Sequence, residues 1–171
     1  MEVTDAIDRR RSIRRFKNKE IPEGMLKEVL RAGHMAPSAG NLQARDYIIV
    51  QDNAVKELLA MAAHNQYFIM SAPVCIVVCA NVSRSSARYG KRGELYAVQD
   101  ASAAIMNMML MAQNLELGTC WIGAFNEAAI TYLLELPSGV RPVALLPIGY
   151  PDESPEAPPR MGEAAEHWGK W

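Results

Sequence analysis

The segment Arg9-Arg10-Arg11-Ser12-Ile13-Arg14-Arg15-Phe16 places five guanidinium groups and one hydroxyl within eight residues near the start of the chain. The planar fork of an arginine matches two oxygens of a phosphate group, and a serine hydroxyl adds a neutral donor. On composition alone, such a cluster more often marks a solvated helix end or a nonspecific polyanion surface. The segment therefore predicts either a phosphate clamp or an exposed basic patch.

A second segment, Ala36-Pro37-Ser38-Ala39-Gly40-Asn41-Leu42-Gln43, combines small side chains with side-chain amides. It lies between a predicted helix and a predicted strand, where a backbone without bulky side chains can approach a flat ligand closely. Taken alone, the stretch is typical of an ordinary loop. Together with the arginine segment, it suggests a site for a planar, phosphorylated cofactor.

The rest of the chain alternates predicted helices and strands, in what we expect to be a single domain of residues 1–171. Residues 74–80 form a continuous apolar, mostly β-branched run, the pattern of a strand buried on both faces. Further strands are expected over 46–51 and 141–149. Helices are expected from Thr4 or Asp5 through the arginines, from Pro22, over 53–64 behind a cap at Asp52 or Asn53, over 96–117, and from Asn126 to Leu136.

Composition limits the possible classes of protein. Half of the residues are hydrophobic and 22% are charged, as in ordinary globular domains, and a net charge of −1 gives no overall attraction to nucleic acid. The first residues lack the apolar stretch of a signal peptide, and the apolar run at 72–80 is far shorter than the roughly 20 residues that span a bilayer. Cys75, Cys79 and Cys120 lie in apolar surroundings, which predicts reduced, buried thiols, a cytoplasmic location and no metal site.

Two regions point to a second copy of the chain. The 96–117 helix is rich in alanine and methionine and apolar almost all round, so it needs burial on nearly every side. A core helix within one chain is the simpler alternative. The C-terminal segment 151–171 is polar and proline-rich, yet it carries Trp168 and Trp171, which need an apolar surface. We expect a homodimer built on the helix, with 151–171 as an arm on the partner.

The order of several motifs resembles the FMN-dependent nitroreductase family over nearly the whole chain. The arginine segment matches an R-R-S-x-R-x-F/Y signature, and Pro37 to Gln43 match a P-S-x-x-N-x-Q loop. The other matching features are Asn65 ahead of Ser71-Ala72-Pro73, the Leu115-to-Gly123 stretch at the end of the long helix, the Gly149-Tyr150-Pro151 turn, and Arg160 after two prolines.

The resemblance implies an α+β fold, a three-layer α/β/α sandwich with a mostly antiparallel central sheet flanked by helices. It also implies an intertwined homodimer with an exchanged C-terminal arm and FMN at the interface. NADH or NADPH would pass hydride to flavin N5, and a nitroaromatic, quinone or similar planar acceptor would then be reduced by ping-pong exchange.

The same resemblance assigns roles to individual residues. The phosphate, ribityl chain or pyrimidine edge would be held by Arg10, Ser12, Arg14 and Arg160, with Arg14 near N1–C2=O, while the second subunit would supply Pro37, Ser38 and Asn41. Asn65 would contact the polar edge of the ring, and Ile122 and Gly123 would line it near N5. The full predicted cofactor-binding set is Arg10, Arg11, Ser12, Arg14, Pro37, Ser38, Ala39, Asn41, Gln43, Asn65, Trp121, Ile122, Gly123 and Arg160.

Residues 82–94 contain four basic side chains, two glycines and no periodic apolar face. This composition favours a solvated surface loop. The alternative is a basic lid over the cofactor that meets the phosphates of NAD(P)H.

The chain departs from the family pattern at Phe68, where some members have lysine, and at Gly123, where many have glutamate. His34, His64 and His167 are scattered without a carboxylate or serine partner, as expected if a flavin carries the chemistry. Two other functions stay open at this point. One is a specialised flavin reaction such as reductive dehalogenation or flavin fragmentation. The other, less favoured, is a nucleic-acid-binding module that uses the N-terminal arginines.

Overall fold

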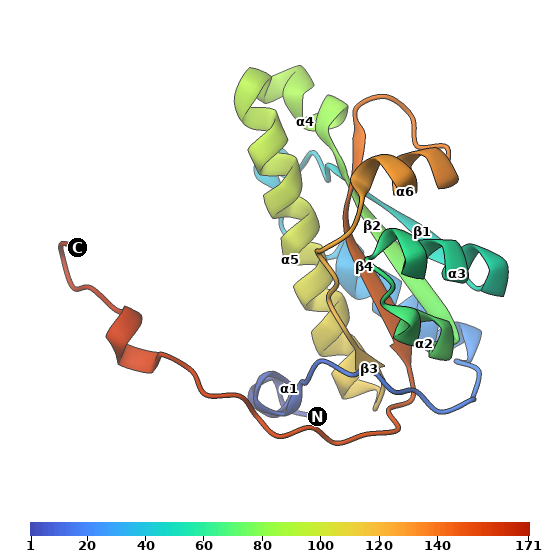
Figure 1. Cartoon of the computed structure of the whole chain (residues 1–171). Coiled ribbons are helices and arrows are strands. Elements are labelled where there is room, and N and C mark those ends of the chain that lie inside the picture. The colour runs from blue at the N-terminus through green and yellow to red at the C-terminus, as the bar shows by residue number, and fades with distance from the viewer.

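The computed structural model describes all residues 1–171 and contains a four-stranded antiparallel sheet between helical layers (Figure 1). The strand order across the sheet is β1-β2-β4-β3, and every neighbouring pair is antiparallel. The strands are β1 (Arg45–Val50), β2 (Val74–Asn81), β3 (Gly118–Thr119) and β4 (Val140–Gly149). The expected antiparallel sheet is confirmed, and its three long strands start and end within one residue of the predicted positions.

Six α-helices and four short 3₁₀ turns complete the fold. The α-helices are α1 (Val3–Arg9), α2 (Glu23–His34), α3 (Asn53–Ala62), α4 (Val82–Tyr89), α5 (Gly93–Asn114) and α6 (Glu127–Leu133). The 3₁₀ turns are η1 (Ala39–Asn41), η2 (Tyr67–Ser71), η3 (Gly90–Arg92) and η4 (Gly162–Ala165). As expected, Asp52 caps α3 and Asn126 caps α6, each by accepting a backbone N–H in the first turn. None of these helices is both long and apolar enough to cross a membrane.

β2 divides the core into two halves, as its uninterrupted apolar sequence predicts. Its residues alternate between two clusters because successive side chains of a strand point to opposite faces. Ile76 and Val78 belong to the cluster with α2 and α5, whereas Cys75 and Val77 belong to the cluster with α3 and α6. The chain is therefore the expected three-layer α/β/α sandwich.

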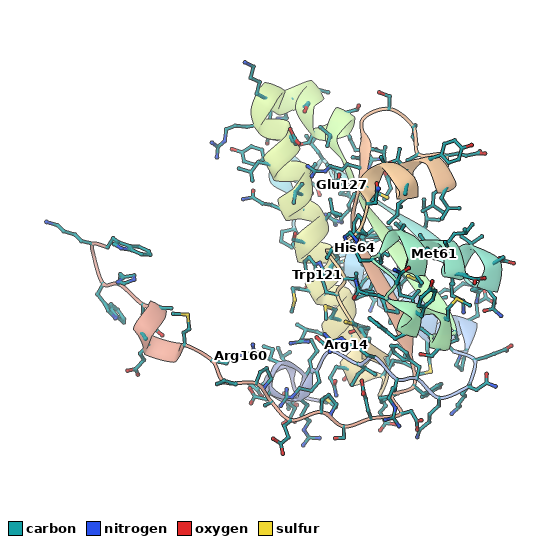
Figure 2. All side chains as sticks on the ribbon, viewed as in Figure 1. Arg14, Met61, His64, Trp121, Glu127 and Arg160 are labelled. Carbon is teal, nitrogen blue, oxygen red and sulfur yellow. The ribbon has the colours of Figure 1, made fainter.

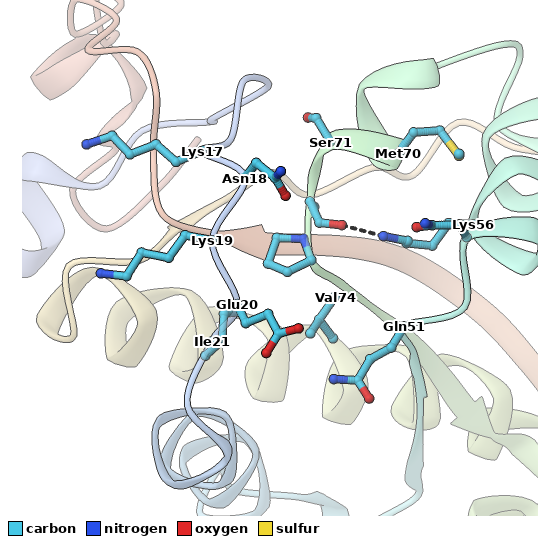
Figure 3. Close-up of a pocket in the computed structure, with 13 residues that line it drawn as sticks. Lys17, Asn18, Lys19, Glu20, Ile21, Gln51, Lys56, Met70, Ser71 and Val74 are labelled. Carbon is cyan, nitrogen blue, oxygen red and sulfur yellow. Dashed lines mark hydrogen bonds between the residues drawn. The ribbon is translucent and has the colours of Figure 1, made fainter.

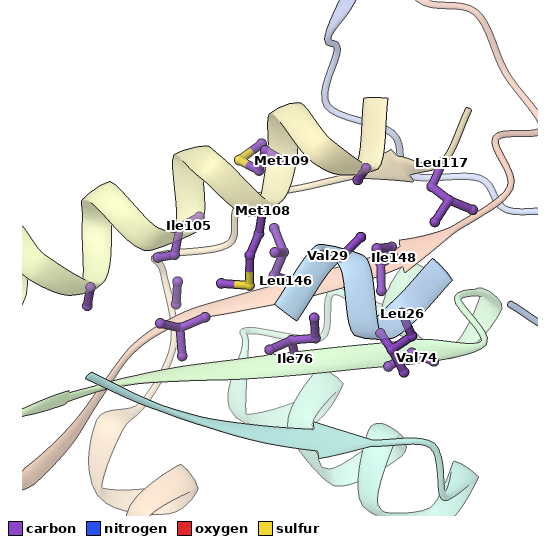
Figure 4. Packing of buried hydrophobic residues seen from close by; sticks show 14 of the residues in the cluster. Leu26, Val29, Val74, Ile76, Ile105, Met108, Met109, Leu117, Leu146 and Ile148 are labelled. Carbon is purple, nitrogen blue, oxygen red and sulfur yellow. The ribbon is translucent and has the colours of Figure 1, made fainter. Parts of the chain in front are cut away.

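α5 covers one face of the sheet together with α2 (Figure 4). Ile105 and Met108 are fully buried, and they join Val29 of α2 in the larger cluster. The opposite side of α5 stays uncovered in the single chain, since Leu95 is 47% exposed and Met106 is 40% exposed. This apolar strip is available for packing against a second chain, which stays a prediction.

The prediction of a loop over residues 82–94 is wrong, because the structure has α4 and η3 there. The Asn81 side chain caps α4 by accepting the Arg84 N–H at 2.9 Å. Ser85 is fully buried on the inner side of the helix, where α4 packs on α5. α4 buries small polar side chains rather than apolar ones, so no hydrophobic period marks it in the sequence.

The first helix is also shorter than predicted. α1 ends at Arg9, and the arginine segment continues in extended form beside β3. The Ile13 N–H donates to the Thr119 carbonyl at 2.9 Å, and Ser12 forms a parallel bridge with Thr119. The segment therefore ends the helix because its backbone forms hydrogen bonds with β3 instead. α3 ends at Ala62 rather than residue 64 because His64 and Asn65 adopt positive φ angles of 57° and 64°.

The C-terminal segment begins against the domain and then leaves it (Figure 1). Pro151 bridges Phe16, and the Asp152 N–H donates to the Arg15 carbonyl at 2.9 Å. Beyond these contacts the segment is exposed, with Trp168 and Trp171 almost fully accessible in the single chain. Its docking on a partner stays a prediction.

All three cysteines are free and buried, as predicted. Burial raises the pKa of the Cys75 and Cys79 thiols to about 12, so neither forms a thiolate at neutral pH. The thiols serve as small core side chains.

The close approach of α4 to α5 generates a prediction on stability. A Cβ at Gly93 would collide with backbone atoms of Ser86, which cannot move without displacing α4. Gly93→Ala should therefore lower the free energy of unfolding by about 1–3 kcal/mol. The matched control is Gly24→Ala on α2, where a Cβ meets nothing within 4 Å and the helix gains up to about 1 kcal/mol. Denaturant unfolding measures both, and equal effects would contradict the predicted packing.

Candidate functional site

The arginine segment 10–16 is held in extended form from two sides. On one side it pairs with β3 through Ser12 and Ile13, as described above. On the other side, the base of the C-terminal segment supplies the Glu153 carboxylate, which accepts the backbone N–H groups of Arg14 and Arg15. The backbone groups are thereby satisfied, and the guanidinium of Arg14 is left exposed.

Arg10, Arg11 and Arg160 line one cavity of about 430 Å³, with Met106 and Leu110 of α5 forming part of its wall. Partial burial, and then the positive charges of Arg160 and Arg11, lower the pKa of Arg10. Neither Arg10 nor Arg160 forms a salt bridge with a carboxylate. Asp8 also lines the cavity but forms no salt bridge with these arginines, so like charges gathered there are a suitable site for a multiply charged anion.

Arg11 behaves differently from its neighbours. Its Nη1 donates to the Asp8 carbonyl at 2.6 Å and to the Arg10 carbonyl at 2.8 Å. The side chain closes the C-terminal end of α1. Although Arg11 lines the cavity, its guanidinium is largely committed to these backbone groups.

Cys120 lies where the arginine segment meets the chain that leads into Trp121. Burial raises the pKa of its thiol, while nearby Arg14, a hydrogen bond with Ser12 and the charge of Arg10 oppose this shift. The side chains of Ser12 and Arg14 therefore lie around Cys120, directly before Trp121. Figure 2 shows Arg14 and Trp121 in the central part of the domain and Arg160 where the tail departs.

The turn that carries Asn65 is hydrogen-bonded to the chain just after Gly123. The Gln66 side-chain amide donates to the carbonyls of Ala63 and Ala124, at 2.9 Å and 3.4 Å. Asn65 is exposed at the tip of this turn. Phe68 packs against the cluster of Ile13, Phe16 and Ala72, so its phenyl ring lies in an apolar environment behind the arginine segment.

The stretch at Ile122 and Gly123 presents backbone rather than side chains. Ile122 is buried and pairs with Leu145 of β4 through two hydrogen bonds of 2.9 Å. Gly123 is exposed, and a Cβ there would meet only Trp121 Nε1, at 3.9 Å. The backbone at Gly123 is thus open to an approaching flat molecule.

Two buried charged side chains fix the loop from Pro37 to Gln43. The Arg45 guanidinium donates to the carbonyls of His34, Ala36 and Pro37, and Asp100 of α5 accepts the N–H groups of Ala39 and Ala44. Both are over 90% buried. Sequence analysis missed these residues; the signal was a lone carboxylate in the middle of the apolar α5.

The loop itself is tightly shaped. The Ser38 hydroxyl accepts the Gln43 N–H at 3.0 Å, and Gly40, Asn41 and Gln43 all adopt positive φ angles. A Cβ at Gly40 would collide with Tyr89 of α4. The side chain of Asn41 is left exposed.

The loop and the arginine cavity lie apart within one chain. The loop is anchored at Asp100 of α5, whereas the cavity wall contains Met106 and Leu110, six and ten residues further along the same helix. These separations correspond to about 9 and 15 Å along the helix axis. The structure therefore gathers Arg10, Ser12, Arg14, Arg160 and Trp121 in one region, links the Asn65 turn to it, and leaves Pro37, Ser38, Ala39, Asn41 and Gln43 elsewhere.

Comparison with known proteins identifies the family. The model of the nitroreductase family matches residues 7–67 and 53–150, which together cover most of the chain. The chain belongs to the nitroreductase family. An FMN reductase [NAD(P)H] of Bacillus subtilis is 32% identical, over 97% of this chain and 73% of that protein.

Solved structures agree with this assignment. B. megaterium NfrA2 superimposes with a TM-score of 0.93 at 28% identity, covering 100% of this chain and 76% of the other. The NADPH:FMN oxidoreductase of Vibrio harveyi, in complex with NAD+, superimposes with a TM-score of 0.92 at 26% identity, covering 99% and 77% of the two chains. Both comparisons support the same α+β fold.

Proposed function

We propose that this nitroreductase-family chain is an FMN-dependent NAD(P)H oxidoreductase. The observation that carries the proposal is the cavity of about 430 Å³ in which Arg10 and Arg160 lie together without a carboxylate partner. A flavin mononucleotide ends in a phosphate group, and arginine forks suit its oxygens. The named activities of the Bacillus subtilis and Vibrio harveyi relatives support the same cofactor and electron donor.

Different residues would contact different parts of FMN. Arg10 and Arg160 would bind the phosphate, and Ser12 would add a neutral donor beside them. Arg14, whose backbone is fixed by Glu153, would direct its guanidinium to the pyrimidine edge of the ring. When bound, FMN supplies the hydride chemistry, accepting a hydride from NAD(P)H and passing electrons to the acceptor.

The stretch from Trp121 to Gly123 and the Asn65 turn would border the ring system. Gly123 leaves its backbone accessible, and Asn65 presents an exposed amide that can donate to ring oxygens. No side chain near them is arranged as an acid–base pair. An open border of this kind suits several planar acceptors, and we propose nitroaromatics and quinones as the substrate class.

The site would be shared by two chains of a homodimer. The support is threefold: the Pro37–Gln43 loop lies far from the arginine cavity of its own chain, α5 leaves an apolar strip exposed at Leu95 and Met106, and the tail carries two exposed tryptophans. A second chain that packed on this strip would bury it and could bring its Ser38 and Asn41 to the cavity. Obligate interfaces of this kind typically bury at least about 2,000 Å².

The first test is cofactor content. The purified protein should be yellow and hold about one FMN per chain, and Arg10→Ala should weaken FMN binding about 10- to 100-fold through loss of a charge-assisted contact. Arg31→Ala, on an exposed ion pair of α2, removes the same charge elsewhere and should leave FMN affinity unchanged. Fluorescence titration with FMN measures both variants. A protein that neither contains nor takes up FMN would overturn the proposal.

The second test is the kinetic order. One planar surface over the ring cannot hold donor and acceptor together, so NAD(P)H oxidation with a quinone or nitroaromatic should give parallel double-reciprocal lines. Steady-state rates over a grid of both substrates provide the measurement. Intersecting lines would show a ternary complex and contradict exchange at a single surface.

The third test is complementation between chains. At limiting FMN, Arg10→Ala and Asn41→Gly should each strongly reduce the activity of the homodimer, the second while keeping the positive φ that position 41 requires. After subunit exchange, each heterodimer would hold one intact and one doubly altered site, so about a quarter of all sites should recover. Native mass spectrometry verifies the exchange. Exchange without any recovery of activity would mean that each site is built within one chain.

A further inference from the structure

A second polar cavity, of about 470 Å³, lies at a different place in the fold (Figure 3). It opens between the segment after the arginines, the start of α3 and the entry to β2. Polar residues dominate its wall, among them Asn18, Glu20, Gln51, Asn53, Lys56 and Ser71. It contains none of the predicted cofactor-binding residues, so its chemistry stands apart from the proposed function.

Lys56 gives this cavity its character. Lys56 belongs to the first turn of α3 and is only 3% exposed, yet it lines the cavity. Its Nζ donates to the Ala72 carbonyl at 2.7 Å, drawn as a dashed line in Figure 3. An ammonium group carries three N–H donors, so this contact leaves two without a partner from the chain.

No carboxylate forms a salt bridge with the buried ammonium group. Asp52 lies one turn earlier, where its carboxylate accepts the Val55 N–H at 2.9 Å as the helix cap, and its charge favours the protonated form of Lys56 from a distance. Glu20 lines the same cavity and forms no salt bridge with Lys56. A buried cation without a direct ion-pair partner is destabilising, and an anion that enters the cavity reduces that cost. Burial lowers the pKa of Lys56, in agreement with its desolvation.

Neutral polar side chains share the wall of the cavity with Lys56. The side-chain amides of Asn18, Gln51 and Asn53 make no hydrogen bond within the chain, although all three line the cavity. Asn53 is also the first residue of α3, whose N-terminus favours negative charge. At the other end of the cavity lie Lys17 and Lys19, the latter with its Nζ 3.9 Å from the centre of the Tyr150 ring.

We propose that this cavity is a binding site for a small oxyanion, the phosphate or carboxylate group of a small polar molecule. The Lys56 ammonium group supplies the charge, and the amides of Gln51 and Asn53 donate to the remaining oxygens. Glu20 on the wall selects for a ligand that also carries a hydroxyl or amino group, because such a group can donate to the carboxylate. The site is independent of FMN.

Inorganic phosphate is the probe for this proposal. The FMN-loaded protein is titrated with phosphate at constant ionic strength, so that the arginine cavity is filled and general screening is held fixed. Amide chemical shifts in ¹H–¹⁵N spectra should move at Gln51, Asn53, Lys56 and Ser71. A parallel titration with a dicarboxylate distinguishes a carboxylate ligand from a phosphate ligand. Absence of shifts at these residues with both probes would overturn the proposal.

Variants test the assigned donors. Lys56→Met should weaken phosphate binding at least about tenfold, as expected for loss of a charge-assisted bond, and Gln51→Leu should weaken it severalfold. Lys27→Met, at an exposed lysine paired with Glu23 on α2, is the charge-matched control and should leave affinity unchanged. If Lys56→Met fails to fold, the exposed Gln51→Leu decides the question. Equal affinity in Gln51→Leu and the original protein would then refute the assignment.

Discussion

Burial of β2 on both faces is the constraint on which the rest of the structure depends. All but the last residue of this strand is buried, so the chain must supply an apolar layer on each side. α5 and α2 form one layer, and α3 and α6 form the other. Once β2 is fixed, β4 pairs along it, and the short β3 finds its place at the far edge of the sheet.

That far edge positions the candidate site. β3 has β4 on one side only, and the arginine segment occupies the other through Ser12 and Ile13. The base of the C-terminal segment then adds a further layer at Glu153. The arginine segment, β3 and the base of the C-terminal segment are distant in sequence, yet hydrogen bonds to backbone groups hold them at one sheet edge. The guanidinium groups of the arginines are therefore not needed to hold these segments in place. Arg11 is the exception, since it closes α1.

Local patterns predicted most of the fold. The continuous apolar run gave β2, and the caps at Asp52 and Asn126 gave two helix starts, because these signals lie within a few residues. α4 escaped prediction because its inner face is made by Ser85 packed on α5, which only tertiary structure reveals. The end of α1 escaped for the same reason, since β3, more than a hundred residues later, provides the competing partner.

For the candidate site, the sequence supplied residue types and order but no distances. The motifs gave Arg10, Ser12, Arg14 and Arg160, and the structure brings these together. Nothing local indicated that Arg45 and Asp100 hold the Pro37–Gln43 loop, because those contacts join distant parts of the chain. The separation of that loop from the arginines also depends on its anchoring point along α5. Contacts between distant residues, such as those of Arg45 and Asp100 with the loop, decide whether two segments meet within one chain or between two chains. The local sequence of the segments does not.

The two cationic cavities carry unpaired charge in physically different ways. Arginine stays protonated throughout the physiological range, so the repulsion between Arg10 and Arg160 persists in the folded chain until an anion arrives. Lys56 differs because burial lowers its pKa, so it loses its proton more readily than an exposed lysine does. Below that pKa the ammonium group is charged and attracts an anion, whereas above it the attraction is lost. The charged and titratable groups around Lys56 are Glu20, Asp52, Cys75 and the more distant Lys17 and Lys19. Asp52, and Cys75 only when it is ionised, act against the effect of burial. Because the Cys75 thiol is neutral at neutral pH, Asp52 is the group that favours the charged form of Lys56 that an anion requires.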